Sequence, residues 1–236
     1  MKKGRLFLIP VPLGATPPEQ SLPQSVVERA RRLDYFVAEN ARSARAFLKS
    51  ISPEKPLREI RIDELNEHSP KDGTRELLAP LLAGNDLGLI SEAGCPAVAD
   101  PGASLVAQAR EAGIQAIPMV GPSAILLALM ASGLPGQNFA FHGYLPVKDE
   151  ARKKKILELE KESRREKRTQ LFIETPYRNQ RILDALLNAC APQTQIGVAI
   201  DLTLPGERIA VHSRAQWQKR EKPPMDKRPA VFMLYA

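Results

Sequence analysis

A loop rich in glycine and proline, residues 91–102, brings together the groups in this chain best suited to bind a ligand. It follows an apolar run at 87–90, and its two glycines and two prolines accompany Ser91, Glu92 and Asp100. Backbone N–H groups without bulky side chains at the carboxyl edge of a sheet form the usual ligand site of open α/β proteins. The spacing is neither GxGxxG nor the lysine-containing phosphate loop, so it indicates neither a dinucleotide nor a nucleoside triphosphate. We predict a ligand loop, with a plain surface connection as the alternative.

Two other turns could contribute to the same site. The first is PVPLGA at residues 10–15, which follows the apolar run at 6–9. The second is the turn Gly121-Pro122, after which Ser123 is placed to cap an apolar helix ending before Gly133. The start of that helix offers backbone N–H groups to a ligand, although the segment could equally be a buried core helix and nothing more.

The net charge of +7 is concentrated in two stretches, residues 148–168 and 219–228, whose basic surplus accounts for all of it. Such a surface attracts a polyanion such as RNA, whereas the alternative is a solvated, charge-rich helix face. Residues 151–168 contain no aromatic side chain, so they offer no stacking of single-stranded bases.

Cysteine, histidine and hydropathy patterns exclude several classes of protein. Cys95 and Cys190 are the only cysteines and the three histidines, His68 among them, are scattered, so we predict neither disulfides nor a metal site. Cys95 fits a small buried filler better than a reactive thiol. No apolar run approaches a membrane span, and the run at 6–9 is too short for a signal peptide, so we expect a cytoplasmic protein without membrane contact.

The order of expected elements gives the fold class, two α/β domains at 1–118 and 119–236. The first half alternates strands (5–9, 35–38, 58–62, 87–90 and 116–120) with helices, of which one from Thr74 to about residue 83 is bent or broken by Pro80; residues 65–73 are turn-like. This pattern predicts a mainly parallel sheet. The second half has strands near 139–143, 169–174, 195–202, 207–212 and 230–235, with helices at 150–166 and 179–190. Because no helix separates 195–202 from 207–212, its sheet should be mixed or antiparallel, and a ligand cleft is expected between the domains.

With these loops laid out, the sequence resembles the tetrapyrrole (corrin and porphyrin) methylases, which are methyltransferases that use S-adenosylmethionine. It is most similar to their ribosomal RNA branch, the small-subunit 2′-O-methyltransferases. The matching stretches run in order along nearly the whole chain: LFLIPVPLG, VAENARSARAFL, LGLISEAGCPAVADPG, VGPSAILLALMASGLP, FAFHGYLP and LFIETPYRN.

The resemblance implies a homodimer in which the methyl donor, S-adenosylmethionine, is folded in the cleft between the two domains. The donor contacts that it implies are Pro12, Leu13, Gly94, Cys95, Val98, Ala99, Ser123, Ala124, Ile173, Glu174, Ala199 and the Pro229–Ala230 region.

Methyl transfer requires alignment of donor and acceptor, and removal of a proton when the acceptor is a hydroxyl. Of the acids near the matching loops, which also include Glu92 and Asp100, we select Glu39 and Glu174 as substrate-side groups. Their alternative roles are helix caps or arginine partners.

The chain departs from the ribosomal RNA branch at three motifs. It has Asn40-Ala41-Arg42 for Asp-Thr-Arg, Glu92 for the aspartate of Ser-Asp-Ala-Gly, and no lysine in 202–207 where the branch has Thr-Lys near the substrate. Longer members add a small C-terminal domain, and we expect the short form, ending at Ala236. Three functions therefore stay open: an RNA methyltransferase acting on the ribosomal small subunit, a small-molecule (tetrapyrrole-like) methyltransferase, and a donor-binding protein without transfer.

Overall fold

Two sheets, each with its own helices, make up the part of the chain that the computed structural model describes, residues 2–66 and 73–236. The chain separates into two units, Met1–Ser123 and Ala124–Ala236. The polar stretch expected at 65–73 falls mostly outside the described residues, as does His68. No helix among the described residues is both long and apolar enough to cross a membrane.

Unit 1 is built on a five-stranded sheet in the order β3-β2-β4-β1-β5, with every pairing parallel. Its strands are β1 (Leu6–Ile9), β2 (Tyr35–Ala38), β3 (Arg61–Glu64), β4 (Leu87–Ile90) and β5 (Ala116–Pro118). Its helices are α1 (Gln24–Arg31), α2 (Ala41–Ile51), α3 (Ala79–Leu82) and α4 (Ala103–Glu111), with 3₁₀ turns at Pro18–Gln20, Leu57–Glu59 and Gly73–Leu78. The parallel sheet predicted for the first half is confirmed.

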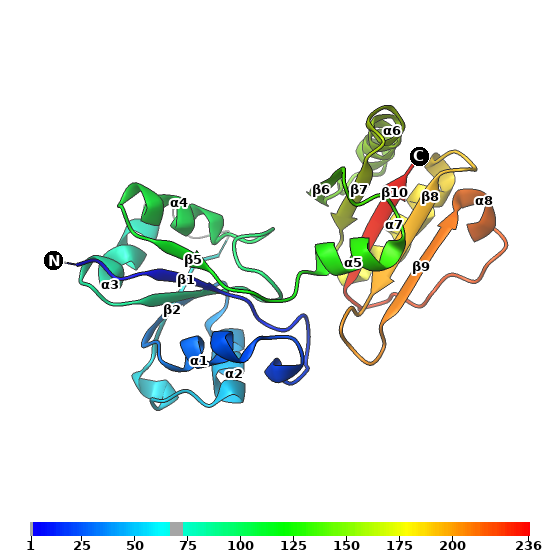
Figure 1. Cartoon of the computed structure of the whole chain (residues 1–236). Coiled ribbons are helices and arrows are strands. Elements are labelled where there is room, and N and C mark those ends of the chain that lie inside the picture. The colour runs from blue at the N-terminus through cyan, green and yellow to red at the C-terminus, as the bar shows by residue number, and fades with distance from the viewer. Residues whose placement is uncertain (1, 67–72) are drawn as a thin grey trace. The chain divides into compact units, whose positions relative to one another are not determined.

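Alternation of side chains along these strands gives unit 1 a core on each face of its sheet. Phe7 and Phe36 pack with α1 and α2, whereas Leu6 and Val37 pack on the opposite face with α3 and α4. Figure 1 shows the two pairs of helices on the two faces. Because β1 and β4 are parallel neighbours in which Ile9 lies opposite Ile90, the loops that follow them start side by side.

Unit 2 contains a mixed five-stranded sheet in the order β6-β7-β10-β8-β9. Its strands are β6 (Phe139–Tyr144), β7 (Thr169–Ile173), β8 (Gln195–Ile200), β9 (Arg208–Ser213) and β10 (Ala230–Tyr235). Its helices are α5 (Ala124–Ser132), α6 (Asp149–Glu166), α7 (Asn179–Ala189) and α8 (Arg214–Trp217), with a 3₁₀ turn at Pro176–Arg178. Only β6 and β7 run parallel, which confirms the mixed sheet.

One large core holds unit 2 together beneath α6 and α7. Ile156 from α6 and Leu186 from α7 are fully buried with Phe172 and Phe232 of the central strands. The two phenyl rings stack with centroids 5.8 Å apart and planes 6° apart. Burial of aromatic side chains is among the largest apolar contributions to a core. The two rings therefore stabilise the position of β7 and β10 in the sheet.

Helix α5 packs against the sheet of unit 2. It contacts β8, β9 and β10, and its buried residues are Ala128 and Leu129. Leu126 and Met130 are 49% and 78% exposed. Within unit 2, the helix therefore buries one of its apolar stripes against the sheet.

Two elements differ from the sequence-based expectation. The strand expected at 58–62 begins instead at Arg61, because Pro56 precedes a 3₁₀ turn at Leu57–Glu59. The helix expected from Thr74 to about 83 is a 3₁₀ turn followed by the short helix α3, with Pro80 in its first turn where proline is tolerated.

Candidate functional site

The loops after β1 and β4 are joined directly through their backbones. Val11 N–H donates to Gly94 O at 3.0 Å, and Gly94 N–H donates to Val11 O at 3.1 Å. Gly94 has φ +72°, and a Cβ there would lie 3.0 Å from Leu13 Cδ2 and 3.1 Å from Pro122 O. Only glycine adopts this conformation and allows this close approach without strain. At Gly94 the loop after β4 therefore packs against both the loop after β1 and the turn that contains Pro122.

The side chains next to this contact face inward. Ser91 Oγ donates to Gly94 O at 2.9 Å, and the thiol of Cys95 donates to Pro122 O at 3.4 Å. Cys95 is half-buried, and burial raises the pKa of its thiol. A raised pKa keeps the thiol protonated at neutral pH, so the structure gives Cys95 a packing role rather than a nucleophilic one.

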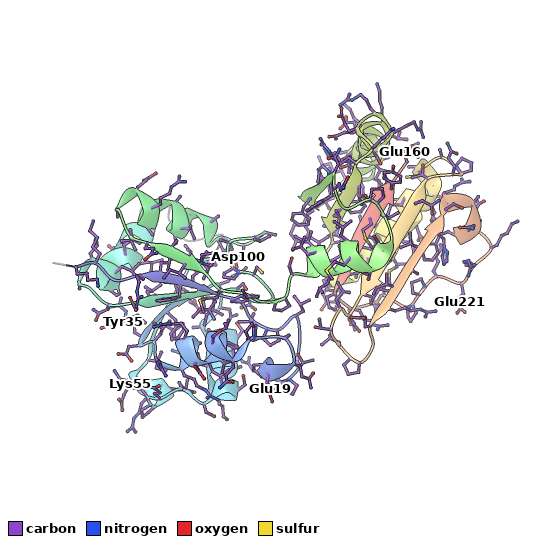
Figure 2. All side chains as sticks on the ribbon, in the orientation of Figure 1. Glu19, Tyr35, Lys55, Asp100, Glu160 and Glu221 are labelled. Carbon is purple, nitrogen blue, oxygen red and sulfur yellow. The ribbon has the colours of Figure 1, made fainter. Side chains whose placement is uncertain are left out.

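Asp100, which Figure 2 labels, holds the remainder of the loop. Its Oδ1 accepts from Ala97 N–H at 3.3 Å and from Gly102 N–H at 2.6 Å. Burial raises the pKa of this carboxyl, and the two N–H donors oppose that shift. Ala97 and Ala99 have φ of 65° and 57°, a conformation that L-residues rarely adopt. Asp100 therefore sustains a strained loop whose tip, including Val98 and Ala99, is exposed.

The segment after β2 begins helix α2 with a complete cap. Asn40 Oδ1 accepts from Arg42 N–H at 2.8 Å and from Ser43 N–H at 3.4 Å, while Ala41 N–H donates to Glu64 at 2.8 Å. Asparagine and aspartate cap helices about equally well, so an aspartate at this position would also cap α2. Glu39 is half-buried directly before this cap.

A cavity of about 250 Å³ opens between these segments of unit 1. Its walls come from the loop after β1, from α2 and from the end of β4. Glu92 lies on its rim and accepts a hydrogen bond from Ser43 Oγ of α2.

In unit 2 the predicted residues lie in register across three neighbouring strands. Val231 of β10 is opposite Ile173 of β7 on one side and opposite Ala199 of β8 on the other. Ala230 is opposite Ile200. Since β10 is antiparallel to both neighbours, the carboxyl ends of β7 and β8 meet the start of β10 at one edge.

Glu174 follows β7 at this edge and is paired with an arginine. Its Oε1 accepts from Thr175 N–H at 2.7 Å and from Arg178 Nε at 2.9 Å, and also from a second guanidinium nitrogen of Arg178. The side chain of Glu174 is 1% exposed. This is the arginine-partner arrangement that the sequence left open for Glu174.

The segment that lacks the branch's lysine is held by Arg228, which sequence reasoning did not single out. Arg228 Nε lies 2.7 Å from Asp201 Oδ2, and its other nitrogens donate to Gly206 O at 2.6 Å and Pro224 O at 3.0 Å. A Cβ at Gly206 would lie 2.7 Å from the guanidinium. The 201–207 and 224–229 loops are therefore locked together by one side chain.

Each unit thus gathers the residues expected to bind the donor at the carboxyl edge of its own sheet. In unit 1, Pro12 and Leu13 lie beside the Gly94–Cys95 segment, with Val98 and Ala99 at the loop tip. Ser123 is the last residue of unit 1 and Ala124 starts α5.

Known proteins resemble the whole chain. Residues 5–216 match the tetrapyrrole (corrin/porphyrin) methylases. A protein of Vibrio cholerae named ribosomal RNA small subunit methyltransferase I is 33% identical over 86% of this chain and 67% of its own length. The protein of the same name from Haemophilus influenzae is 32% identical over 87% and 69%.

A solved structure agrees in fold. That of the methyltransferase CobJ aligns over 99% of both chains with a TM-score of 0.64 at 19% identity. From the match over residues 5–216, together with relatives about one third identical, it follows that this chain belongs to the tetrapyrrole (corrin/porphyrin) methylase family, a family of methyltransferases.

Proposed function

We propose that this protein transfers a methyl group from S-adenosylmethionine to RNA, and specifically to a ribose 2′-hydroxyl of small-subunit ribosomal RNA. The observation that carries the proposal is the identity of about one third, over most of this chain, with proteins named as methyltransferases of that RNA. The 2′-hydroxyl as acceptor comes from the resemblance of the loop motifs to that branch.

The residues present suit the donor. Small residues (Gly94, Ala99, Ala199 and Ala230) border the two sheet edges, so little side-chain bulk stands at these positions. The loops joined at Val11 and Gly94 in unit 1, and the ends of β7, β8 and β10 in unit 2, contain the residues that the resemblance assigns to the donor. When bound, it supplies an electrophilic methyl group on a sulfonium, so the protein's own residues need only orient the two reactants and take up a proton.

Glu39 and Glu174 remain our predicted substrate-side groups. Glu174 has its Oε1 engaged by Arg178, so we assign it to orienting the chain at the end of β7 in addition to any contact with substrate. Glu39 stands between β2 and the capped start of α2. A carboxylate at either place would accept a hydrogen bond from a hydroxyl ligand.

Helix α6 supports an RNA acceptor. Arg152 and Glu160 are buried within unit 2, where Arg152 donates to Val147 O and Glu160 accepts from Ala191 N–H. The other basic residues reach solvent, and exposed examples are Lys153, Lys154, Lys161, Arg164 and Lys167. Cations on an exposed helix bind phosphates without reading sequence, and such binding weakens as salt rises.

We also propose a homodimer located in the cytoplasm. Both follow from the resemblance to the family.

The deciding experiment is transfer of radiolabelled methyl from S-adenosylmethionine to small ribosomal subunits taken from a strain that lacks this gene, with a small-molecule extract assayed in parallel. We expect label in ribosomal RNA. Label only in the small-molecule fraction would instead identify a metabolite methyltransferase. Donor binding without label in either fraction would indicate a donor-binding protein without transfer.

A further inference from the structure

The cavity of unit 1 is lined by both apolar and polar residues. Its apolar walls include Val11, Pro12, Phe47 and Ile90, and its polar groups include Ser43 and Glu92. Its volume of about 250 Å³ is enough for a group the size of a nucleoside. An apolar or planar part of a ligand could therefore pack against the apolar residues, while a polar part could form hydrogen bonds with the polar ones.

The described residues use only part of the accepting capacity of the Glu92 carboxylate. Among the described residues, Ser43 Oγ is its sole hydrogen-bond donor, and no described lysine or arginine forms an ion pair with it. The hydroxyl of Ser43 has a single proton to donate. Asn40 O lies 2.9 Å from Ser43 Oγ and competes with Glu92 for that proton. An ionised carboxylate can accept about four hydrogen bonds, so Glu92 is open to a donor from a ligand.

The cavity does not suit an anionic group. The first backbone N–H groups of α2, which would otherwise attract a phosphate, are taken by Asn40 and Glu64. Glu92 adds a negative charge of its own. A neutral ligand with hydroxyl donors fits better, and Phe47 supplies an aromatic side chain to the lining against which a base can pack.

The cavity also borders the loops that we assign to the methyl donor. Pro12 lines it, and Glu92 precedes Gly94 by two residues. A hydroxyl bound at Glu92 would therefore stand next to these loops within unit 1.

We propose that this cavity holds the acceptor nucleotide of the RNA and that Glu92 is the general base that receives the proton of its ribose hydroxyl. This role rests on the proposed methyl transfer to RNA. The hydroxyl oxygen forms a bond to the methyl carbon as the carbon–sulfur bond of the sulfonium breaks, and the electron pair of that bond remains on sulfur. The hydroxyl proton passes to Glu92, which is exposed and can release it to water. Ser43 orients the carboxylate.

The test compares Glu92→Gln, Glu92→Asp and Ser43→Ala with the control Glu111→Gln, which removes an exposed carboxylate at the end of α4. We expect Glu92→Gln to lower single-turnover methyl transfer about 100-fold or more, as loss of a general base does, while binding S-adenosylmethionine within twofold of the parent in calorimetry. Glu92→Asp should recover part of the rate, and Ser43→Ala should lose less than Glu92→Gln.

Two results would overturn this role. Transfer by Glu92→Gln within threefold of the parent would exclude a base at this position. Donor binding weakened tenfold or more, in a variant whose circular dichroism is unchanged, would show that the cavity belongs to the donor.

A second measurement judges the cavity even if no RNA is methylated. Uridine, cytidine and their 2′-deoxy forms are titrated into isotope-labelled protein saturated with S-adenosylhomocysteine, and the amide resonances of Ser43, Phe47 and Glu92 are followed. We expect the ribonucleosides to shift these resonances more than the deoxy forms do, and Glu92→Gln to reduce the difference. Equal shifts, or none, would contradict the nucleoside site, whereas failure of the parent to methylate any RNA would instead remove the proposed function.

Discussion

The two units hold their candidate site loops by different means. In unit 1 the loops are held by hydrogen bonds that involve backbone groups: the Val11–Gly94 pairing, the Asn40 cap and the N–H donors to Asp100. In unit 2 the corresponding loops depend on two arginine–carboxylate pairs, Arg178–Glu174 and Arg228–Asp201. A backbone pairing persists through most side-chain changes, whereas an ion pair loses its support with one substitution. We therefore expect the edge of unit 2 to be the more fragile of the two.

The largest effect should come from Arg178→Met. It leaves Glu174, whose side chain is 1% exposed, without its cation. Breaking a buried pair in this way costs about 3 kcal/mol of folding stability. Fluorescence of Trp217, the single tryptophan, reports unfolding of unit 2 in a denaturant titration.

The double variant Arg178→Met with Glu174→Gln is the matched control. It also removes the buried negative charge of Glu174, which the single variant leaves without a cation. It should recover more than half of the loss. A single variant as stable as the parent would show that the pair contributes nothing and would remove the contrast between the units.

The next largest effect is expected from Gly94→Ala, and Gly133→Ala is its control. The pair separates the cost of steric crowding around a new Cβ from the cost of the left-handed backbone conformation. Gly94 and Gly133 have φ of 72° and 70°, but a Cβ at Gly133 meets nothing within 4 Å. Gly133→Ala should therefore cost about 1 kcal/mol, from the left-handed conformation alone. Gly94→Ala should cost about 2 kcal/mol, because Leu13 and Pro122 must also move.

Circular dichroism in denaturant measures the stability of both variants, and calorimetry measures their affinity for S-adenosylmethionine. Gly94→Ala should weaken donor binding about tenfold, and Gly133→Ala should leave it unchanged. Equal effects of the two variants on donor binding would argue against a donor contact at Gly94.

A smaller effect is expected at the α2 cap of unit 1. Asn40→Ala removes the acceptor for two backbone N–H groups and should lower stability by about 1 kcal/mol. Asn40→Asp should leave stability unchanged, since both side chains cap well. Denaturant unfolding followed by circular dichroism tests the pair, and a loss in Asn40→Asp equal to that in Asn40→Ala would show that the amide has some other role.

The smallest effect should be seen in Lys161→Ala on α6. Lys161 is exposed and forms no ion pair with the described residues, so stability should change by less than about 0.5 kcal/mol. If the ammonium contacts a phosphate, the slope of log affinity for ribosomal RNA against log salt should fall by about 0.7–0.9. Arg110→Ala, at the end of α4 in unit 1, is the control and should leave the slope unchanged. Identical slopes for both variants would remove α6 from the RNA surface.

Sequence reasoning located the strands more reliably than the contacts at the site. The bounds of β2, β4 and β10 were predicted because each is an apolar run closed by polar or turn-forming residues. β3 was misplaced because a proline-led 3₁₀ turn looks like the start of a strand.

The side-chain pairs at the site could not be read from spacing. Ser43 and Glu92 are 49 residues apart, and Arg228 and Asp201 are 27 apart. Nothing local indicates either pair, because they form only when separate loops reach the same sheet edge. The glycines and prolines were more informative, since they predicted a loop after the strand at 87–90, and the structure has that loop between β4 and α4.

The central claim, methylation of a ribose in small-subunit RNA, is tested most directly by mass spectrometry of nucleosides from that RNA, prepared from cells with and without this gene. We predict that one 2′-O-methylated nucleoside is lost without the gene and returns when the gene is restored. Identical nucleosides in all three preparations would contradict the account.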